Sequence, residues 1–373
     1  MAARDQDSRT ELERRIRNMR PWEDKIRKVT PYVPGEQPKI KDIIKLNTNE
    51  NPYPPAPGVA KKLANLDVNA FTKYPDPNVS DLVNAIASFY GLDASQVFVG
   101  VGSDDVIAQS FMTFFNSDKP IMFPDITYSF YDVWAKLFNI PYETKPLNDS
   151  FEICASDYYG ENGGIIFPNP NAPTGVAVSL SFIEDILKHN KDVIVIIDEA
   201  YVDFGTKSAM SLINHYDNLL VVQTFSKSRS AAGLRIGYAC GNPELIAALN
   251  AVKQSYNSYT MNYPSIVLGV EIVNDRPYFE KCCKQVVDTR EKTKEALSEL
   301  GFTFPDSKTN FIFATHPKYD AKEIFEYLRN NNIIVRHFNA PRIDNYLRIS
   351  IGTDAQMNRL IDVIKEYISK KKA

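Results

Sequence analysis

The chain has 373 residues, too many for one compact core of ordinary size, which predicts a large domain with a smaller companion. Lysine and arginine number 43 against 46 aspartates and glutamates, and this net charge of −3 argues against binding to nucleic acid or to an anionic membrane. The composition, 44% hydrophobic and 24% charged, is that of a folded protein.

The four cysteines show no C-x-x-C spacing and the four histidines are scattered, so we expect reduced thiols and no metal site. No run of about 18 apolar residues exists to span a membrane. The first twenty residues are highly charged and lack the apolar core of a signal peptide; we expect a short helix or a disordered extension. These features predict a cytoplasmic protein whose residues 1–45 form an N-terminal extension and arm.

Residues 46–262 alternate short β-rich runs with helical stretches, which predicts a large α/β domain with a mostly parallel sheet. The stretch Val193–Ile197 is β-branched throughout without alternation, as expected of a central strand covered on both faces. Helices are expected at Val106–Phe115 and Ser181–Asn190. The other expected strands are Gln96–Val101, Pro120–Phe123, Ile165–Phe167 and Leu219–Phe225.

Residues 263–373 lack this regular alternation of strands and helices, which predicts a smaller α+β domain. A long helix is expected over Pro277–Leu300, because Gly301 is suited to end a helix. A last helix places Met357, Leu360, Ile361, Ile364 and Ile368 on one face. The elements expected between them are strands at Phe311–Ala314, Ile333–Val335 and Tyr346–Ser350 and a helix near Ala321–Asn330.

A lysine and an arginine follow the apolar run Leu219–Phe225. Lys227 stands at the end of that strand, where open α/β sheets bind their ligands, although a lone lysine there could equally be a surface residue. Arg235 lies in the apolar sequence Gly-Leu-Arg-Ile-Gly, and a partly buried guanidinium needs an anionic partner. With Ser226 beside them, the two cations favour a phosphate ester as ligand.

Two more strand ends carry polar residues. Asp198 follows the wholly apolar strand and is either a buried structural aspartate or the partner of a cation such as a protonated pyridine ring. The loop Pro168–Gly175 contains three prolines and presents Asn171, whose amide could donate to a phenolate oxygen; alone, this signal is weak because Asn and Pro are ordinary turn residues.

A glycine-rich turn, Val99–Gly102, precedes Ser103 and Asp104 and an expected helix. Such a turn aims free backbone N–H groups at an anion. A dinucleotide site is disfavoured, because G-x-G-x-x-G requires glycine where Asp105 stands. We expect the side chains of both aspartates to cap the helix while their N–H groups face a phosphate.

These segments resemble the fold-type I aminotransferases that depend on pyridoxal 5'-phosphate (PLP), from about Pro31 to the C-terminus. The resemblance is closest to histidinol-phosphate aminotransferases. The motifs that carry it are Thr30–Tyr32, Asn47–Pro52, Lys73–Pro75, Gly102–Asp104, Asn171–Gly175, Asp198–Tyr201, Ser226–Lys227, Gly233–Gly237 and Leu347–Gly352. One departure is Ala172, where some relatives have a second asparagine.

The resemblance implies a role for each matching residue. Lys227 would carry PLP as a Schiff base and act as the catalytic base, and Asp198 would hold the pyridinium. Asn171 and Tyr201 would bond the phenolate oxygen, and Tyr128 would stack on the ring. The phosphate would be held by Ser103, Asp104, Ser226 and Arg235, and by Tyr74 from the neighbouring subunit of a homodimer. The substrate would be bound by Arg348, with Arg336, Tyr32 and Asn49.

The resemblance further implies the reaction. The expected activity is transamination of L-histidinol phosphate with 2-oxoglutarate, giving imidazole acetol phosphate and L-glutamate in histidine biosynthesis. The alternatives are an aromatic-amino-acid aminotransferase and a lyase like threonine-phosphate decarboxylase, because such enzymes share nearly every cofactor residue. A sensor domain is disfavoured, since residues 1–30 are too short to form an attached DNA-binding domain.

Overall fold

The computed structural model describes residue 20, residues 22–38 and residues 42–372. The chain divides into two compact units, Met1–Val33 and Pro34–Ala373. The first contains the short helix η1 (Glu23–Lys25), next to which Arg20 Nε donates to Glu23 Oε1 at 2.8 Å. Apart from Arg20, the expectation for the first twenty residues lies outside the described part of the chain. No described helix has the length and apolar character needed to cross a membrane.

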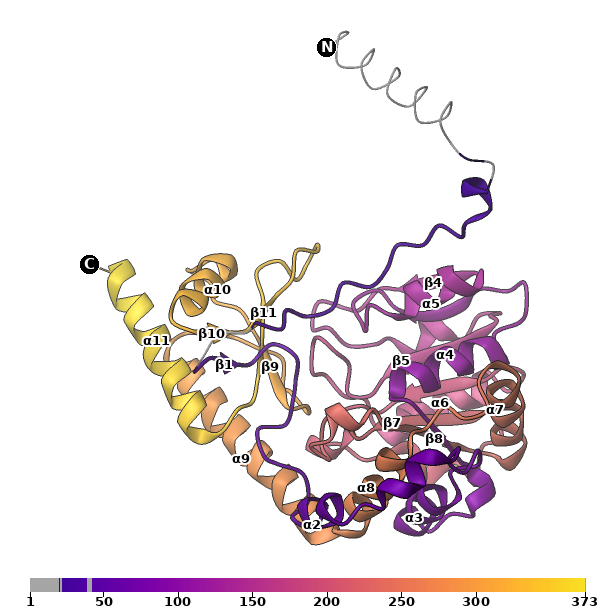
Figure 1. Ribbon diagram of the computed structural model, residues 1–373. Coiled ribbons are helices and arrows are strands. Elements are labelled where there is room, and N and C mark those ends of the chain that lie inside the picture. Colours follow the sequence, from indigo (N-terminus) through magenta and orange to yellow (C-terminus); the bar gives the residue numbers. More distant parts are fainter. Residues whose placement is uncertain (1–19, 21, 39–41, 373) are drawn as a thin grey trace. The chain divides into compact units, whose positions relative to one another are not determined.

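A seven-stranded sheet forms the centre of the larger unit (Figure 1). Its order is β2-β8-β7-β6-β5-β3-β4, and all neighbours are parallel except β8, which runs antiparallel to β2 and β7. The strands are β2 (Val97–Gly100), β3 (Ile121–Pro124), β4 (Tyr142–Lys145), β5 (Gly164–Pro168), β6 (Val195–Asp198), β7 (Leu219–Thr224) and β8 (Gly237–Gly241). The predicted α/β fold with a mostly parallel sheet is confirmed.

The sequence reasoning missed two strands of this sheet. The edge strand β4 reads Tyr-Glu-Thr-Lys and is only partly buried, so it has no apolar run. Strand β8 begins and ends with glycine, a residue more typical of turns, yet every position in it is buried.

Helices cover both faces of the sheet. Val195 and Ile197 of β6 belong to one core cluster, which includes α3, α6 and α8, whereas Ile196 belongs to another, with α4, α5 and α7. Each such side chain stabilises the fold by about 1.5–3 kcal/mol on burial. The missing alternation in this strand therefore reflects its coverage on two sides. The helices are α3 (Ser80–Tyr90), α4 (Ser103–Phe114), α5 (Tyr131–Phe138), α6 (Leu180–His189), α7 (Pro243–Tyr256) and α8 (Tyr263–Asn274).

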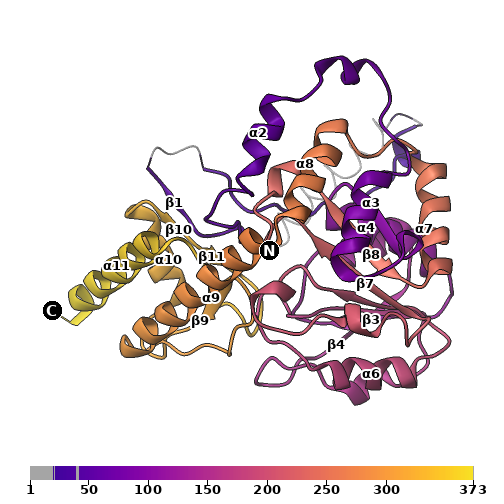
Figure 2. The ribbon, with the colours of Figure 1, turned by 90° about the horizontal axis from the view of Figure 1, so that it is seen from below.

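A smaller antiparallel sheet, in the order β11-β12-β9, lies in the C-terminal part of the chain. Figures 1 and 2 both show the helices of the C-terminal part gathered around it. Its strands are β9 (Phe311–Ala314), β11 (Arg336–His337) and β12 (Leu347–Ser350), and the helices are α9 (Arg276–Glu299), α10 (Ala321–Asn330) and α11 (Asp354–Lys372). The predicted long helix and last helix are thus confirmed.

The remaining elements connect these two sheets. Strand β1 (Ile44–Lys45) pairs in parallel with β10 (Ile333–Ile334), and α2 (Gly58–Ala64) packs on α8. Helix α8 lies after the expected boundary between residues 262 and 263, yet it also packs on α3 of the expected large domain. This boundary and the other expected domain limits stay predictions. The short helices are η2 (Val68–Thr72), η3 (Ala94–Gln96), η4 (Ala155–Tyr158), η5 (Val202–Phe204), η6 (Ala209–Leu212) and η7 (Ala232–Leu234).

Candidate active site

The polar residues predicted from the strand ends meet at one edge of the large sheet. Strand β6 ends at Asp198 and the neighbouring β7 ends three residues before Lys227. The carboxyl ends of parallel strands lie at the same edge, which is where such sheets bind ligands. The ammonium of Lys227 is close enough to Asp198 to favour its charged form, and it lies 5.7 Å from the centre of the Tyr201 ring.

Asp198 is a buried carboxylate held by two donors. Tyr131 Oη donates to its Oδ2 at 2.8 Å, and the backbone N–H of Ala200 donates to Oδ1 at 3.2 Å. Burial raises the pKa of Asp198 to about 6, against the opposing effect of these hydrogen bonds and of Lys227. No described Lys, Arg or His forms an ion pair with this carboxylate, so the site offers a desolvated negative charge to a cationic ligand.

The next residue, Glu199, points to the opposite side, as expected for neighbours at a strand end. Its carboxylate accepts from Ser208 Oγ at 2.5 Å, from the backbone N–H of Ala209 at 2.6 Å and from Gln223 Nε2 at 2.8 Å. Burial raises the pKa of Glu199 to about 7. Its hydrogen bonds are all made within the protein interior, so Asp198 is the carboxylate available to a ligand.

Lys227 is tied to the segment Asn47–Asn51, which the sequence reasoning had associated with no role beyond Asn49. Its Nζ donates to the carbonyl oxygen of Thr48 at 3.0 Å. Asn51 Nδ2 donates to the carbonyl oxygens of Lys227 at 3.0 Å and of Ser228 at 3.3 Å. The segment therefore holds both the ammonium and the backbone of the lysine.

The glycine-rich turn brings the start of α4 next to Arg235. Gly102 has φ +85, and a Cβ there would lie 2.5 Å from Arg235 Nη2, so both its conformation and its surroundings require glycine. Arg235 Nη2 approaches Asp104 Oδ2 at 3.4 Å, and Tyr128 Oη donates to Asp104 Oδ1 at 2.7 Å. The first N–H groups of an α-helix have no partner within the helix, so this corner suits an anion.

The expectation that both aspartates cap α4 is wrong. The helix has no side-chain cap. Asp104 instead binds Tyr128 and Arg235, and Asp105 Oδ2 accepts from the backbone N–H of Val101 at 2.9 Å and from Gln109 Nε2 at 3.0 Å. Other donors, from Val101, Arg235 and Tyr128 outside the helix and from Gln109 within it, occupy these carboxylates instead.

Two further residues predicted to bind the cofactor are Ser226 and Asn171. Ser226 is buried, and its Oγ accepts from Thr224 Oγ1 at 3.0 Å, which leaves its own proton available. Asn171 is also buried, but its Nδ2 donates to Ile126 O at 2.9 Å and to Thr174 Oγ1 at 3.1 Å. Asn171 would have to exchange one of these bonds in order to donate to a ligand.

Two arginines face each other on the small sheet. Arg336 and Arg348 are direct cross-strand partners in the antiparallel pair β11–β12, and each guanidinium lies 5.7 Å from the Phe338 ring. Like charges at such positions repel, so the pair is suited to an anion. Arg348 Nη2 also donates to Asn47 O at 3.0 Å, which brings this pair to the segment that holds Lys227.

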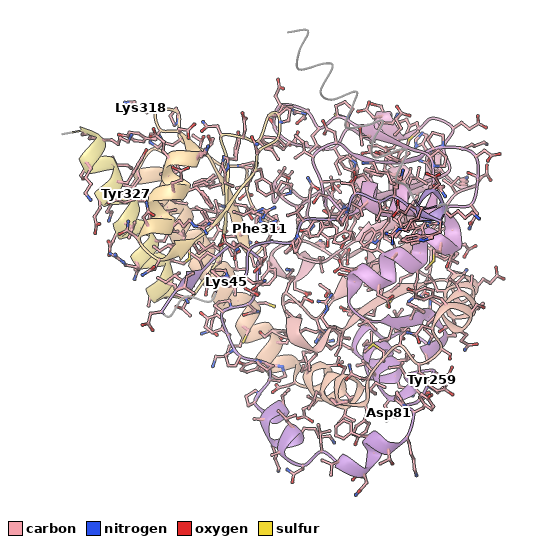
Figure 3. The ribbon with its side chains drawn as sticks, turned by 45° about the horizontal axis from the view of Figure 1, so that its top comes forward. Lys45, Asp81, Tyr259, Phe311, Lys318 and Tyr327 are labelled. Atoms are coloured by element: carbon pink, nitrogen blue, oxygen red, sulfur yellow. The ribbon has the colours of Figure 1, made fainter. Side chains whose placement is uncertain are left out.

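The small sheet meets Tyr201 through an aromatic contact. The rings of Tyr201 and Phe311 lie edge to face with centroids 5.2 Å apart, and the Arg348 guanidinium lies 5.4 Å from the Phe311 ring. Figure 3 shows Phe311 on the side of the small sheet that faces the larger sheet. The predicted catalytic lysine, tyrosine and substrate-binding arginine are thus brought into one region.

Three further predicted site residues are Tyr74, Tyr32 and Asn49. Tyr74 is 81% exposed and stacks on Tyr259 with centroids 4.6 Å apart. Tyr32 belongs to the N-terminal unit, so its role stays a prediction. Asn49 is buried, with both polar atoms of its side chain bonded to protein groups.

The sequence reasoning missed three contributors to the site. Tyr131, Thr48 and Asn51 contact Asp198 or Lys227. Thr48 and Asn51 lie in the motif Asn47–Pro52, but no role was expected at these two positions. Thr48 acts through its carbonyl oxygen, which every residue possesses. For Tyr131, the only signal was its position after β3, whose carboxyl end lies at the same edge.

Comparison with known proteins defines the class. Residues 41–364 match the family of class I and II aminotransferases, and the chain belongs to that family. The histidinol-phosphate aminotransferase of Acinetobacter baylyi is 53% identical over 354 residues, which cover 94% of this chain and 98% of that protein. The enzyme of the same name from Lactococcus lactis subsp. cremoris is 49% identical over 350 residues, covering 94% and 98%.

A solved structure shares the fold. The histidinol-phosphate aminotransferase of Sinorhizobium meliloti, in complex with pyridoxal-5'-phosphate, has a TM-score of 0.78 at 22% identity, covering 87% of this chain and 91% of that one. Enzymes of this family depend on PLP. The residues described above fit that group. The buried carboxylate of Asp198 suits the ring nitrogen, and Lys227 lies at the neighbouring strand end. The start of α4 beside Arg235 suits the phosphate.

Proposed function

We propose that this chain transfers the amino group of L-histidinol phosphate to 2-oxoglutarate, giving imidazole acetol phosphate and L-glutamate in histidine biosynthesis. The observation that carries the substrate assignment is the facing pair Arg336 and Arg348. Histidinol phosphate and glutamate both present an anion, and a forked guanidinium binds phosphate and carboxylate alike. One pocket therefore serves both half-reactions.

The chemistry divides between the cofactor and the chain. Bound PLP supplies an electron sink for the substrate carbon that bears the amine. Asp198 keeps a proton on the ring nitrogen, because its buried charge is stabilised by a neighbouring cation. Lys227 would hold the cofactor covalently at rest, and its amine, once displaced, would take the proton from the substrate carbon. Tyr201 donates its hydroxyl proton to the phenolic oxygen, and Tyr128 covers the ring.

The anionic end of the cofactor has its own residues. Arg235, Ser226 and the backbone N–H groups of Ser103 and Asp104 bind the phosphate. The hydroxyl proton of Ser226 is available because its oxygen accepts from Thr224. The N-terminus of α4 adds a partial positive charge.

The activity is tested with purified protein and PLP. We expect L-glutamate to form from histidinol phosphate and 2-oxoglutarate, with no release of CO₂. Aromatic amino acids and threonine phosphate serve as competing substrates. Faster turnover of an aromatic amino acid, or CO₂ release from threonine phosphate, would replace the proposed substrate by that alternative.

Arg348→Ala is expected to weaken substrate binding much more than turnover at saturation. Loss of a two-pronged, charge-assisted contact removes about 3 kcal/mol, which is about a hundredfold in KM. The measurement is KM for both histidinol phosphate and 2-oxoglutarate, because one guanidinium serves both anions. Arg359→Ala is the matched control, since Arg359 forms a surface ion pair with Glu366 at 3.6 Å. An unchanged KM in Arg348→Ala would contradict the assignment.

We also propose that the active unit is a homodimer in which Tyr74 completes the partner's phosphate site. Tyr74 and nearby residues form an exposed apolar surface, to which Val68, Phe71, Tyr256 and Tyr259 contribute. Surfaces of this kind mark interfaces.

Mixed dimers test this proposal. Lys227→Ala and Tyr74→Ala subunits are each expected to be weakly active or inactive alone. On mixing and exchange, one site of each hybrid regains both residues, so activity should recover. No recovery in a verified hybrid would place Tyr74 in its own subunit's site, and a monomeric wild-type protein in sedimentation would exclude the dimer.

The proposed location is the cytoplasm. The four cysteines form no disulfide in the described residues, consistent with a reducing compartment. Recovery of the native enzyme in the cytosolic fraction of its cell would support the location, and recovery outside that fraction would contradict it.

A further inference from the structure

Asn49 is the most heavily bonded residue of the segment Asn47–Asn51. It is 1% exposed and has φ +56, a left-handed conformation that asparagine tolerates better than most residues. Its Nδ2 donates to Tyr201 Oη at 2.9 Å, and its Oδ1 accepts from Ser350 Oγ at 2.8 Å. Its backbone N–H donates to Ser350 Oγ at 2.9 Å, and its carbonyl oxygen accepts from Asn310 Nδ2 at 3.0 Å. All its polar groups are engaged.

Ser350 determines which way the Asn49 amide faces. The Ser350 oxygen accepts the backbone N–H of Asn49, so its single proton must go to another acceptor. That acceptor is Asn49 Oδ1. If the amide were reversed, the buried Ser350 proton would lose its partner, which is unfavourable. The NH₂ group of Asn49 therefore faces Tyr201.

This orientation controls the Tyr201 hydroxyl. Because Asn49 donates to its oxygen, the tyrosine cannot give its own proton to Asn49. The proton is left to point elsewhere, and the phenolic oxygen of the cofactor is the acceptor that the proposed function places near Tyr201. A carboxylate at position 49 would do the opposite and draw the proton away from the site.

The same residue links the two sheets. Tyr201 follows β6 of the large sheet, whereas Ser350 ends β12, which also carries Arg348. The backbone N–H of Ser350 also donates to Leu46 O at 3.0 Å, so the strand is bonded both to Asn49 and to the residue just before this segment. A shift of either sheet would therefore change the position of the Tyr201 hydroxyl through its hydrogen bond with Asn49.

We propose that Asn49 is a positioning residue that directs the Tyr201 proton toward the cofactor and couples this tyrosine to the strand that carries Arg348. This role differs from the direct substrate contact expected for Asn49, because both polar atoms of its side chain are already bonded to protein groups. The inference rests on the proposed function in one respect, namely that Tyr201 contacts PLP.

The test is a pH titration of the visible absorption of the PLP-loaded enzyme. Losing a donor to the phenolic oxygen leaves more negative charge there, so a neighbouring proton on the cofactor is held more tightly. Asn49→Asp and Tyr201→Phe should therefore both raise the midpoint pH of this titration by about one unit. One hydrogen bond to a charged group produces a change of this size. Ser350→Ala should raise it less, because the amide remains but is no longer oriented.

The double variant Asn49→Asp/Tyr201→Phe tests whether Asn49 acts through Tyr201. Its midpoint should equal that of Tyr201→Phe alone. The matched control is Asn139→Asp, another asparagine in left-handed conformation, with φ +58 at the exposed C-terminal end of α5, and its midpoint should not move. Asn49→Asp retains a residue that tolerates this conformation, and Ser350→Ala reports on the same contact if that variant does not fold.

Three results would overturn the inference. An Asn49→Asp or Ser350→Ala enzyme with lower thermal stability but an unchanged midpoint would reduce Asn49 to a structural role. Additive shifts in the double variant would show that it acts independently of Tyr201. A wild-type protein that binds no PLP would end the proposed function and, with it, this inference, whereas the first two results leave the proposed function standing.

Discussion

Lys227→Ala is expected to lose turnover by about 10⁴-fold, the upper end of what a positioned proton-transferring group contributes, while the protein still folds. The half-buried side chain makes a single hydrogen bond through Nζ, to Thr48 O, so its removal should lower the free energy of unfolding by only about 1 kcal/mol. The measurements are transamination rate, urea unfolding and sedimentation. Lys188→Ala, an exposed lysine near the end of α6, is the control.

A second measurement separates attachment from catalysis. After reduction with borohydride, the wild-type chain should gain the mass of the cofactor, and Lys227→Ala should not. Appreciable activity in Lys227→Ala, or an equal mass gain in both proteins, would contradict the role of this lysine.

Asp198→Asn is expected to lower turnover by about 10³-fold. A carboxylate and a ring cation about 4 Å apart attract each other by about 4 kcal/mol at an effective dielectric near 20, and a neutral amide gives up most of this. The amide keeps the shape of the side chain and still offers an acceptor for the N–H of Ala200. Activity within tenfold of the wild type would exclude Asp198 as the partner of the ring nitrogen.

The same variant should stabilise the cofactor-free protein, and only above about pH 4. The folded pKa of Asp198 is about 6, above its ordinary value of 3.8, so folding takes up a proton between these pH values. Rising pH through this window lowers the stability of the wild type by up to about 3 kcal/mol, whereas asparagine does not titrate. Asp198→Asn should therefore be the more stable protein at pH 8, and the two should converge near pH 4.

Urea unfolding at several pH values measures this difference. Asp132→Asn is the control, because Asp132 is part of a surface ion pair with Lys136 and should change stability by less than about 1 kcal/mol. Equal stability of Asp198→Asn and the wild type at pH 8 would mean that the site carboxylate is not desolvated. Enzyme sites typically lower the stability of the protein in this way, because catalysis requires groups in unfavourable surroundings.

Local sequence predicted the elements whose signals are strong and contiguous. The core strands, such as Val193–Ile197, and the long helix ending before Gly301 agree with the structure to within a few residues. Strands β4 and β8 were missed because partial burial and glycine hide the apolar signal. The predicted capping of α4 was wrong because Asp105 accepts instead from the backbone N–H of Val101. Cap chemistry depends on competing partners, which sequence spacing does not reveal.

The meeting of Asp198 and Lys227 follows from the sequence alone. Asp198 ends one apolar strand and Lys227 lies three residues after another, and parallel strands deliver their carboxyl ends to one edge of a sheet. The tertiary structure alone decided how Lys227, Tyr201 and Arg348 are held, because those bonds join positions 179, 152 and 301 residues apart through the segment Asn47–Asn51. No periodicity encodes such contacts, because they form where the two sheets meet the segment Asn47–Asn51.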